Sequence, residues 1–376
     1  MKCIDELSEK DLKGKRVVLR VDFNLPLDAQ GNVADMFRVK QAWKTVQYLS
    51  ERGARVIAMS HIGKDETETL EPVARAINEF AKIMFIPDIT GPIARDTVSA
   101  MKDGEIVLLE NLRCDPREKK NDETFAKELA SLGDLYVDDA FAAAHREHAS
   151  IVGVPKFLPA YAGFLIRDEV SNLQAALNPE RPSFAILGGA KFETKAPLIS
   201  KLLATYDHLF IVGALANDIF KARGLPVGKS LVSKELPDED VLEHDNLIAP
   251  VDVTVEQSDG QARVKKPEEV AEDDKIMDIG PDSVALVAPY IANAKFILWN
   301  GTTGYYEGGY ISWMKAIGEL MGKSAAKKVI GGGDTIAAIE ASGVDQSKLG
   351  FLSTGGGAML EYLLKGSLPG IDVLNK

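Results

Sequence analysis

The sequence lacks the features that mark several large classes of protein. It contains two cysteines among 376 residues, too few for the disulfide framework of a small secreted domain. No apolar run approaches the roughly 18 residues of a membrane-spanning helix. No repeat at solenoid spacing and no low-complexity tract occurs. The first residues, MKCIDELSEKDLKGKR, are charged throughout and lack the apolar stretch of a secretory signal. We therefore expect a protein of the cytoplasm with free thiols at Cys3 and Cys114.

An excess of positive charge is also absent. The chain has 44 lysines and arginines against 56 aspartates and glutamates, a net charge of −12. Surfaces that bind nucleic acid or anionic membranes are basic, so the composition argues against both as partners. A small anionic substrate is still compatible with it, because a few converging arginines make a local positive pocket.

Short apolar runs alternate with helical patterns along the whole chain. The runs cover residues 16–23, 55–61, 105–111, 134–141, 183–190, 208–214, 246–255, 295–301 and 327–333. Near-continuous Val, Ile and Leu runs between helices are typical of buried parallel strands with crossover helices. The pattern predicts the α/β class with doubly wound, Rossmann-like parallel sheets, which bind ligands beyond the carboxyl ends of their strands.

These runs are too many for one sheet and predict two domains. Pro155 and Pro159 precede a helical pattern from about Leu165 to Leu177, which Pro179 and Pro182 close. We expect a first domain over 1–160, an interdomain helix over 161–178 and a second domain over 179–363.

Polar side chains collect in the first half, most of them directly after a predicted strand. They are Asp22, Asn24, Arg38, His61, Lys64, Arg113, His145, Arg146 and His148. Any one of them could be an ordinary loop residue. Several strand ends each carry a cationic side chain or an imidazole. This pattern is typical of a site for a small, multiply charged anion, because a guanidinium group can donate two parallel hydrogen bonds to one anionic group.

Glycine-rich turns replace the arginines in the second half. Lys191 follows a strand and a glycine pair, and Lys195 lies one helical turn further on. Asn300 and Glu307 belong to another glycine-rich loop. The turns GGGDT (331–335) and TGGGA (354–358) each precede a helical pattern. Glycines let backbone approach a ligand, and helix N-termini attract anions, so these turns predict a nucleotide triphosphate site.

Asp334 fits two roles. Asp334 or Thr335 is the natural N-cap of the helix that follows GGGDT. A carboxylate beside a phosphate-binding helix end is also a ready Mg²⁺ ligand, because Mg²⁺ usually takes one or two carboxylates plus substrate phosphates. The two roles are compatible.

Two other nucleotide-binding patterns can be set aside. GLPVGKS (224–230) is one residue short of the phosphate-loop pattern and follows a helix end, so we predict a connecting loop. No G-x-G-x-x-G follows the first strand, which argues against a nicotinamide dehydrogenase.

The ordered motifs resemble the phosphoglycerate kinase family. They are RVDFNLP, SHIG, LLENLR, DAFAAAHREHAS, LGGAKFETK, KARGLPVGKS, DIGP, WNG, GGGDT and STGGGA. The resemblance implies a first domain that binds 3-phosphoglycerate and a second that binds Mg-ATP or Mg-ADP. It implies the glycolytic transfer of a phosphoryl group between 1,3-bisphosphoglycerate and ADP, in line and upon hinge closure. A monomer and a C-terminal tail, about 364–376, that packs back on the first domain are also implied.

The resemblance further assigns roles to single residues. The glycerate ligand would be held by Asp22, Asn24, Arg38, His61, Lys64, Arg113 and Arg146. The nucleotide would be held by Lys191, Lys195, Gly213, Asn300, Glu307, Gly332, Gly333, Asp334 and Thr335, with Asp334 also on the Mg²⁺ ion. Arg38 and Lys191 would act in catalysis. The helix N-terminus at Gly355, Gly356 and Gly357 would lie behind the transferred group.

Several positions depart from the family pattern. The usual His-x-Gly-Arg-Pro is here His61-Ile62-Gly63-Lys64-Asp65, and lysine keeps the charge but loses the bidentate fork. Val212-Gly213-Ala214 replaces a glycine triplet, and Thr302-Thr303 replaces Pro-Met, which bears on nucleotide preference. The alternative to an active kinase is a non-catalytic nucleotide-binding module with the same fold. The presence of Arg38, Lys191 and Asp334 argues against that alternative.

Overall fold

The computed structural model describes residues 1–64 and 66–375, which divide into two units. The first unit contains Met1–Ser171 together with Ser367–Lys376, and the second contains Asn172–Gly366. Each unit has its own six-stranded parallel sheet, so the predicted α/β class is confirmed. Asp65 and Lys376 lie outside the described residues. In the part of the chain that is described, no helix is long and apolar enough to cross a membrane.

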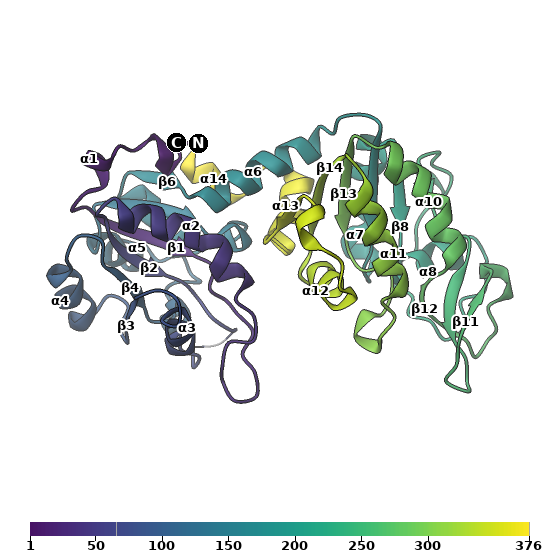
Figure 1. Ribbon diagram of the computed structural model, residues 1–376, viewed down its shortest axis with the longest axis horizontal. Coiled ribbons are helices and arrows are strands. Elements are labelled where there is room, and N and C mark those ends of the chain that lie inside the picture. The colour runs from purple at the N-terminus through teal and green to yellow at the C-terminus, as the bar shows by residue number, and fades with distance from the viewer. Residues whose placement is uncertain (65, 376) are drawn as a thin grey trace. The chain divides into compact units, whose positions relative to one another are not determined.

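The sheet of the first unit has the strand order β3-β4-β2-β1-β5-β6 (Figure 1). Its strands are β1 (Arg16–Val21), β2 (Arg55–Met59), β3 (Met84–Ile86), β4 (Ile106–Leu109), β5 (Leu135–Asp139) and β6 (Ala160–Ala162). The apolar runs predicted the four central strands. The edge strands β3 and β6 went unpredicted because three residues carry no recognisable periodicity.

Helices cover this sheet. They are α1 (Glu9–Leu12), α2 (Phe37–Glu51), α3 (Glu71–Ile77), α4 (Pro92–Ala100), α5 (Glu123–Ser131), α14 (Pro369–Leu374) and the first half of α6 (Phe164–Leu177). In α2, Val39, Ala42, Val46 and Leu49 recur at three- or four-residue spacing, so one face is apolar. That face is buried in the same core cluster as side chains of β1 and β2.

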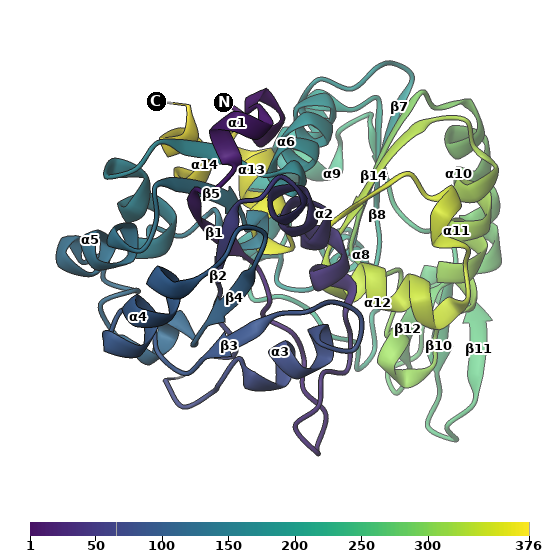
Figure 2. The ribbon, with the colours of Figure 1, turned by 60° about the vertical axis from the view of Figure 1, so that its left-hand side comes forward.

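The C-terminal helix α14 belongs to the first unit. The Gly370 N–H donates to the Ala144 carbonyl at 2.8 Å, and Ile371 and Leu374 are buried. Figures 1 and 2 show α14 close to the N-terminal segment, where Cys3 bridges to β6. Helix α14 is therefore packed into the first unit, far in sequence from the rest of that unit.

The second unit repeats the architecture with the strand order β15-β14-β13-β7-β8-β9. Its strands are β7 (Ser183–Leu187), β8 (His208–Ile211), β9 (Leu247–Ile248), β13 (Phe296–Asn300), β14 (Lys327–Gly331) and β15 (Phe351–Ser353). Its helices are α7 (Phe192–Thr205), α8 (Ala214–Ala222), α9 (Glu239–Leu242), α10 (Pro281–Asn293), α11 (Ser312–Lys323), α12 (Gly333–Ser342) and α13 (Gly357–Lys365). Trp299 is fully buried at the centre of its core. Residues 224–230 form a loop after α8, as predicted.

The predicted single strand over 246–255 is wrong. The run divides into β9 of the parallel sheet and β10 (Val253–Glu256) of a separate antiparallel sheet. Figure 2 shows β10 beside β11 and β12. Pro250, which has no N–H to give to a sheet, stands at the break. The separate sheet has the order β11-β10-β12, with β11 (Ala262–Lys265) and β12 (Lys275–Ile279).

Helix α6 begins on a buried carboxylate. Asp139 Oδ1 accepts from the N–H groups of Leu165 at 2.8 Å and Ile166 at 3.2 Å. A Cβ on Gly163 would lie 2.2 Å from the same oxygen, so this approach requires glycine. The boundary between the two units, after Ser171, falls inside this helix.

We predict that Asp139 makes stability fall with rising pH. Burial raises the pKa of Asp139 to about 7, above the value of about 3.9 in an unfolded chain. The folded state therefore holds the proton more tightly, and this contribution is complete below pH of about 4 and lost as pH rises through about 7. Asp139→Asn cannot ionise. The urea midpoint of the wild type should thus fall relative to the variant between pH of about 4 and about 8.

Asp122→Asn serves as the control. Asp122 caps α5 through a 2.9 Å bond from the Phe125 N–H and is partly exposed. The difference in urea midpoint between Asp122→Asn and the wild type should change less with pH than the difference between Asp139→Asn and the wild type. Equal pH dependence of the wild type and Asp139→Asn would contradict the prediction.

Candidate active site

The predicted anion-binding residues of the first unit lie along one edge of its sheet. Because β1, β2, β4 and β5 are parallel, their carboxyl ends meet at that edge. Asp22 follows β1, His61 follows β2, Arg113 follows β4 and Arg146 follows β5. Strand order in space therefore collects residues that are far apart in the sequence.

Arg38 reaches this edge from the first turn of α2. Its Nη1 donates to Asp22 Oδ2 at 2.8 Å and to the Asn24 carbonyl at 3.2 Å. The Arg38 side chain is one-third exposed, whereas that of Asp22 is almost fully buried. The buried carboxylate fixes one nitrogen of the guanidinium and leaves the other N–H donors available to a ligand.

Arg113 packs against the loop that follows β2. Its Nη1 donates to the Gly63 carbonyl, and the Gly63 N–H donates to Asn24 Oδ1 at 2.9 Å. Its Nε is buried and has no hydrogen-bond partner in the described structure. Burial lowers the pKa of Arg113, and nearby Arg146 lowers it further. An unpaired buried donor among cations indicates a place for an anion.

His61 is buried within the same group of cations. Its pKa is lowered well below the usual value by burial, and then by Arg20, Arg113 and Arg146. The pKa of His148 is lowered to about 4 by burial, followed by Arg146. Both imidazoles are therefore neutral at pH 7, and the positive charge of the site comes from arginine.

The other predicted cations lie at the rim of this group. Arg146 Nε is 3.4 Å from His145 Nε2. Lys64 is exposed, and within the described residues its ammonium makes no hydrogen bond or ion pair. Its carbonyl accepts from Lys119 Nζ at 3.0 Å. The backbone at Lys64 is thus held while its side chain is left unpaired.

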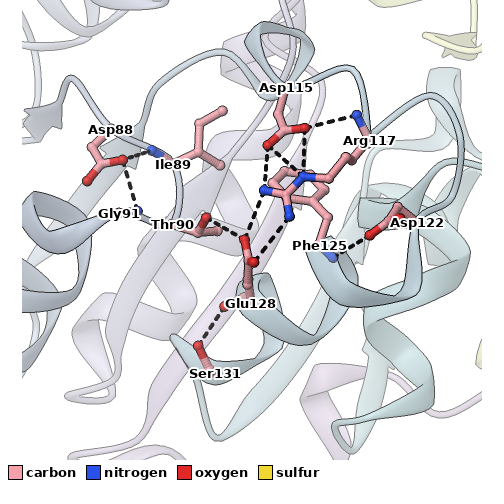
Figure 3. Close-up of polar contacts among 10 residues, drawn as sticks. All are labelled: Asp88, Ile89, Thr90, Gly91, Asp115, Arg117, Asp122, Phe125, Glu128 and Ser131. Carbon is pink, nitrogen blue, oxygen red and sulfur yellow. Dashed lines mark hydrogen bonds and ion pairs between the residues drawn. The ribbon is translucent and has the colours of Figure 1, made fainter.

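The segment that carries Arg113 is clamped to α5 (Figure 3). The Arg117 guanidinium lies between Asp115, at 2.7 Å, and Glu128 of α5, at 3.0 Å. Glu128 also accepts from the Thr90 hydroxyl at 3.0 Å. Single exposed ion pairs stabilise little, but a guanidinium shared by two carboxylates fixes geometry.

Three buried polar residues of this site were not predicted. They are Arg20, Glu118 and Ser150. Arg20 left one indication in the sequence, a charged residue inside the otherwise apolar strand RVVLRV. Glu118 lies in the charged run DPREKKNDE, where nothing distinguishes a buried carboxylate from its exposed neighbours.

In the second unit, the GGGDT turn joins β14 to α12. The N-cap of α12 is Gly332, so the predicted cap at Asp334 or Thr335 is wrong. The Thr335 hydroxyl instead accepts from the Gly301 N–H at 2.8 Å. Gly332 has φ of +105°, and a Cβ there would lie 2.8 Å from that hydroxyl oxygen. The turn requires glycine because the tight bend brings its backbone against Thr335.

A second glycine turn lies beside the first. Strand β15 pairs with β14, with Ser353 opposite Gly331, so Gly355, Gly356 and Gly357 follow at the neighbouring strand end. Gly356 is the N-cap of α13. No other atom lies within 4 Å of where a Cβ on Gly356 or Gly357 would be. The same holds for Gly333 in the first turn of α12. Both helix N-termini thus carry glycines with open space beside them among the described residues, a favourable arrangement for phosphate.

Asn300 and the two predicted lysines occupy neighbouring strand ends. Asn300 Nδ2 donates to the Gly331 carbonyl at 2.8 Å and so joins β13 to the first glycine turn. Lys191 is the N-cap of α7 and has φ of +65°, which is uncommon for a residue other than glycine. Backbone in such a conformation is often found at ligand sites. Burial lowers the pKa of Lys195.

A cavity of about 540 Å³ opens among the loops after β7, β8 and β13. Gly213, Glu307, Thr302, Thr303 and Asp278 are among its lining residues. The volume is in the range of small-molecule sites. Burial raises the pKa of Asp278 to about 7. Two of the predicted nucleotide residues, Gly213 and Glu307, therefore line the cavity, while Asn300 and the glycine turns lie at strand ends outside its lining.

Asp334 lies at the start of α12, beside the first glycine turn. Its carboxylate is exposed in the first turn of α12, and no hydrogen bond or ion pair occupies it within residues 1–64 and 66–375. The same residues contain no group of three or more metal-ligating side chains. A Mg²⁺ ion held here would depend on phosphate oxygens for further ligands, which is its usual mode with nucleotides.

Comparison with known proteins agrees with this geometry. The family model described as phosphoglycerate kinase matches residues 7–366. The phosphoglycerate kinase of Moorella thermoacetica is 41% identical over 389 aligned residues, which cover 98% of each chain. That of Aquifex aeolicus is 42% identical over 385 aligned residues, which cover 96% of each chain.

Solved structures give the same result. The structure of phosphoglycerate kinase from Coxiella burnetii matches with a TM-score of 0.82 and 34% identity, covering 97% of this chain and 96% of that one. The crystal structure of phosphoglycerate kinase from Pyrococcus horikoshii matches with a TM-score of 0.86 and 29% identity, covering 100% and 98%. Matches over nearly the whole length, in sequence and in fold, show that this chain belongs to the phosphoglycerate kinase family of phosphotransferases.

Proposed function

We propose that the protein reversibly transfers a phosphoryl group from the acyl phosphate of 1,3-bisphosphoglycerate to Mg-ADP, giving 3-phosphoglycerate and ATP. One observation carries the proposal: Arg113 and Arg146 follow β4 and β5, and Arg38 reaches the same carboxyl ends of the strands from the first turn of α2, where it bonds Asp22. A group of arginines with unused donors suits a ligand that bears a phosphate and a carboxylate.

The first unit would bind the glycerate substrate. Arg38 is held by Asp22 and retains free N–H groups, and Arg113 has an unpaired buried Nε. Asn24 supports the loop that carries His61 and Lys64 through its bond from the Gly63 N–H. These contacts orient the donors before a ligand arrives, which reduces the entropy lost on binding.

The second unit would bind the nucleotide. The cavity at Gly213 and Glu307 would take the base and ribose, and the turns at Gly332 and Gly356 would take phosphates at helix N-termini. Lys191 and Lys195 would add positive charge beside them. Asp334 would hold Mg²⁺, which when bound neutralises phosphate charge during transfer.

The chemistry needs alignment more than acid–base help. An oxygen of the ADP β-phosphate attacks the phosphorus of the acyl phosphate, the bond to the carboxyl oxygen breaks, and the carboxylate leaves. Both the attacking and the leaving oxygen are ionised, so no general base is required. Arg38 and Lys191 would stabilise the charge on the transferred group. Because the two ligands bind to different units, transfer requires hinge closure, which also excludes water.

The remaining family properties are part of the same proposal. We place the protein in the cytoplasm, as a monomer, in glycolysis and gluconeogenesis, with the first unit as the glycerate-binding domain and the second as the nucleotide-binding domain. The overall charge of −12 argues against nucleic-acid or membrane partners. It is compatible with small anionic substrates, because the arginines of the first unit make a local positive pocket.

Arg38→Ala should lower kcat by at least about 100-fold, because it removes a positioned cation from the transferred group. The measurement is NADH oxidation with 3-phosphoglycerate, ATP and Mg²⁺, coupled through glyceraldehyde-3-phosphate dehydrogenase. The control is Arg52→Ala at the other end of α2, where the guanidinium stacks on Tyr48. Wild-type Mg-ADP binding without turnover would favour a non-catalytic nucleotide-binding module.

Lys64→Arg should lower KM for 3-phosphoglycerate several-fold and leave kcat nearly unchanged. Lys64 is exposed and unpaired in the described structure, and arginine would replace a point charge with a bidentate fork. Lys119→Arg, whose Nζ bonds the Lys64 carbonyl, is the matched control. An unchanged or higher KM for Lys64→Arg would refute the prediction.

Asp334→Asn should raise the Mg²⁺ concentration needed for half-maximal rate by about tenfold or more, because it removes the carboxylate ligand but keeps the shape. Titration of MgCl₂ at fixed ATP measures the change. Glu340→Gln removes an exposed carboxylate elsewhere on α12 and should leave the titration unchanged. Identical titrations for the wild type and Asp334→Asn would place the metal ligand elsewhere.

A further inference from the structure

Glu118 is a buried carboxylate beneath the arginines of the first unit. Its side chain is 1% exposed, and carboxylates are seldom buried this fully unless they are paired. Burial raises its pKa, while Arg20, the bonds from Ser150 and then Arg113 act in the opposite direction. Glu118 is thus a buried carboxyl group set among cations, which oppose the effect of burial on its pKa.

Glu118 is bound to Ser150 by both of its oxygens. The Ser150 N–H donates to Oε2 at 2.9 Å, and the Ser150 hydroxyl lies 2.6 Å from Oε1. Arg20 Nε lies 3.0 Å from the same hydroxyl oxygen and can only donate. The single hydroxyl proton of Ser150 must therefore point to Glu118, and the direction of each bond is determined.

The chain of bonds continues to His61. Arg20 Nη2 lies 3.0 Å from His61 Nδ1. Because a guanidinium has no acceptor, Nδ1 must accept, and a neutral imidazole then carries its proton on Nε2. The charged and titratable groups around His61 are Arg20 of β1, Arg113 after β4, and Arg146 and His148 after β5. All of them disfavour a second proton on the ring.

We propose that Glu118 is a positioning residue that acts through Ser150 and Arg20 to hold His61 as the neutral tautomer with its N–H at Nε2. We call this series of bonds, from Glu118 through Ser150 and Arg20 to His61, the relay. The relay leaves His61 Nε2 free as a hydrogen-bond donor, which would bind an anionic oxygen of the glycerate substrate. This role rests on the proposed function for its substrate. The tautomer itself can be measured without any substrate.

Glu118→Gln tests the relay. Ser150 offers two donors to two carboxylate oxygens, and glutamine has one acceptor oxygen. One Ser150 donor would therefore face an NH₂ group, and the charge that restrains Arg20 would be lost. Glu128→Gln is the matched control, since both Glu128 oxygens also accept, from Arg117 and Thr90, without contacting Arg20 or His61.

The first readout is the ¹⁵N NMR spectrum of the full chain labelled at its five histidines, with His61 assigned by His61→Gln. The wild type and Glu128→Gln should show His61 protonated at Nε2 alone. Glu118→Gln should show loss of that single tautomer. Ser150→Ala keeps the Glu118 charge but breaks the relay, so it should give the same change and covers the case in which Glu118→Gln folds poorly.

The second readout is steady-state kinetics. KM for 3-phosphoglycerate should rise about tenfold in Glu118→Gln, the effect expected for losing one hydrogen bond to a charged group, and kcat should change far less. If Glu118→Gln and Ser150→Ala both keep His61 protonated at Nε2 and leave KM for 3-phosphoglycerate unchanged, the proposal is overturned. If the wild type shows His61 protonated at Nε2 but no turnover, the proposed function is refuted, whereas the relay still holds.

Discussion

Parallel pairing places the carboxyl ends of all strands of a sheet at one edge, and this constraint decides where both units carry their functional groups. In the first unit it brings Asp22, His61 and Arg113 together from three strand ends. In the second it sets the Gly332 and Gly356 turns side by side through the pairing of β14 with β15.

In the first unit, positively charged arginine side chains lie close together at that edge, and their repulsion opposes folding. Burial lowers the pKa values of both His61 and Arg113, and neighbouring arginines lower both further, as expected from this repulsion. Buried Asp22 and Glu118 offset part of it through contacts with Arg38 and, by way of Ser150, with Arg20. An anion would relieve the remainder, so the repulsion in the free protein favours binding.

The sequence was sufficient to predict the α/β class and the central strands, because long apolar runs carry a clear period. It could not reveal β3 and β6, each three residues long, or the division of 246–255 at Pro250. The N-cap of α12 was misassigned because Asp and Thr are good caps in isolation, whereas Thr335 bonds Gly301 from another loop. Glu118 was missed because burial of one charge in a charged run depends on tertiary packing.

The two units attract anions through different chemical groups. This difference determines which substitutions we expect to affect ligand binding. In the proposed function, the second unit binds phosphate through backbone N–H groups at helix N-termini, with Lys191 and Lys195 beside them. Side chains at Val212, Ala214 and Thr302 do not alter those N–H groups as long as Gly213 and Gly332 keep their positive φ. The first unit relies on guanidinium side chains whose geometry depends on buried partners. We therefore expect lysine in place of arginine at position 64, which removes a bidentate fork, to weaken recognition of the glycerate ligand. Changes around the cavity are expected to adjust only the fit of the nucleotide.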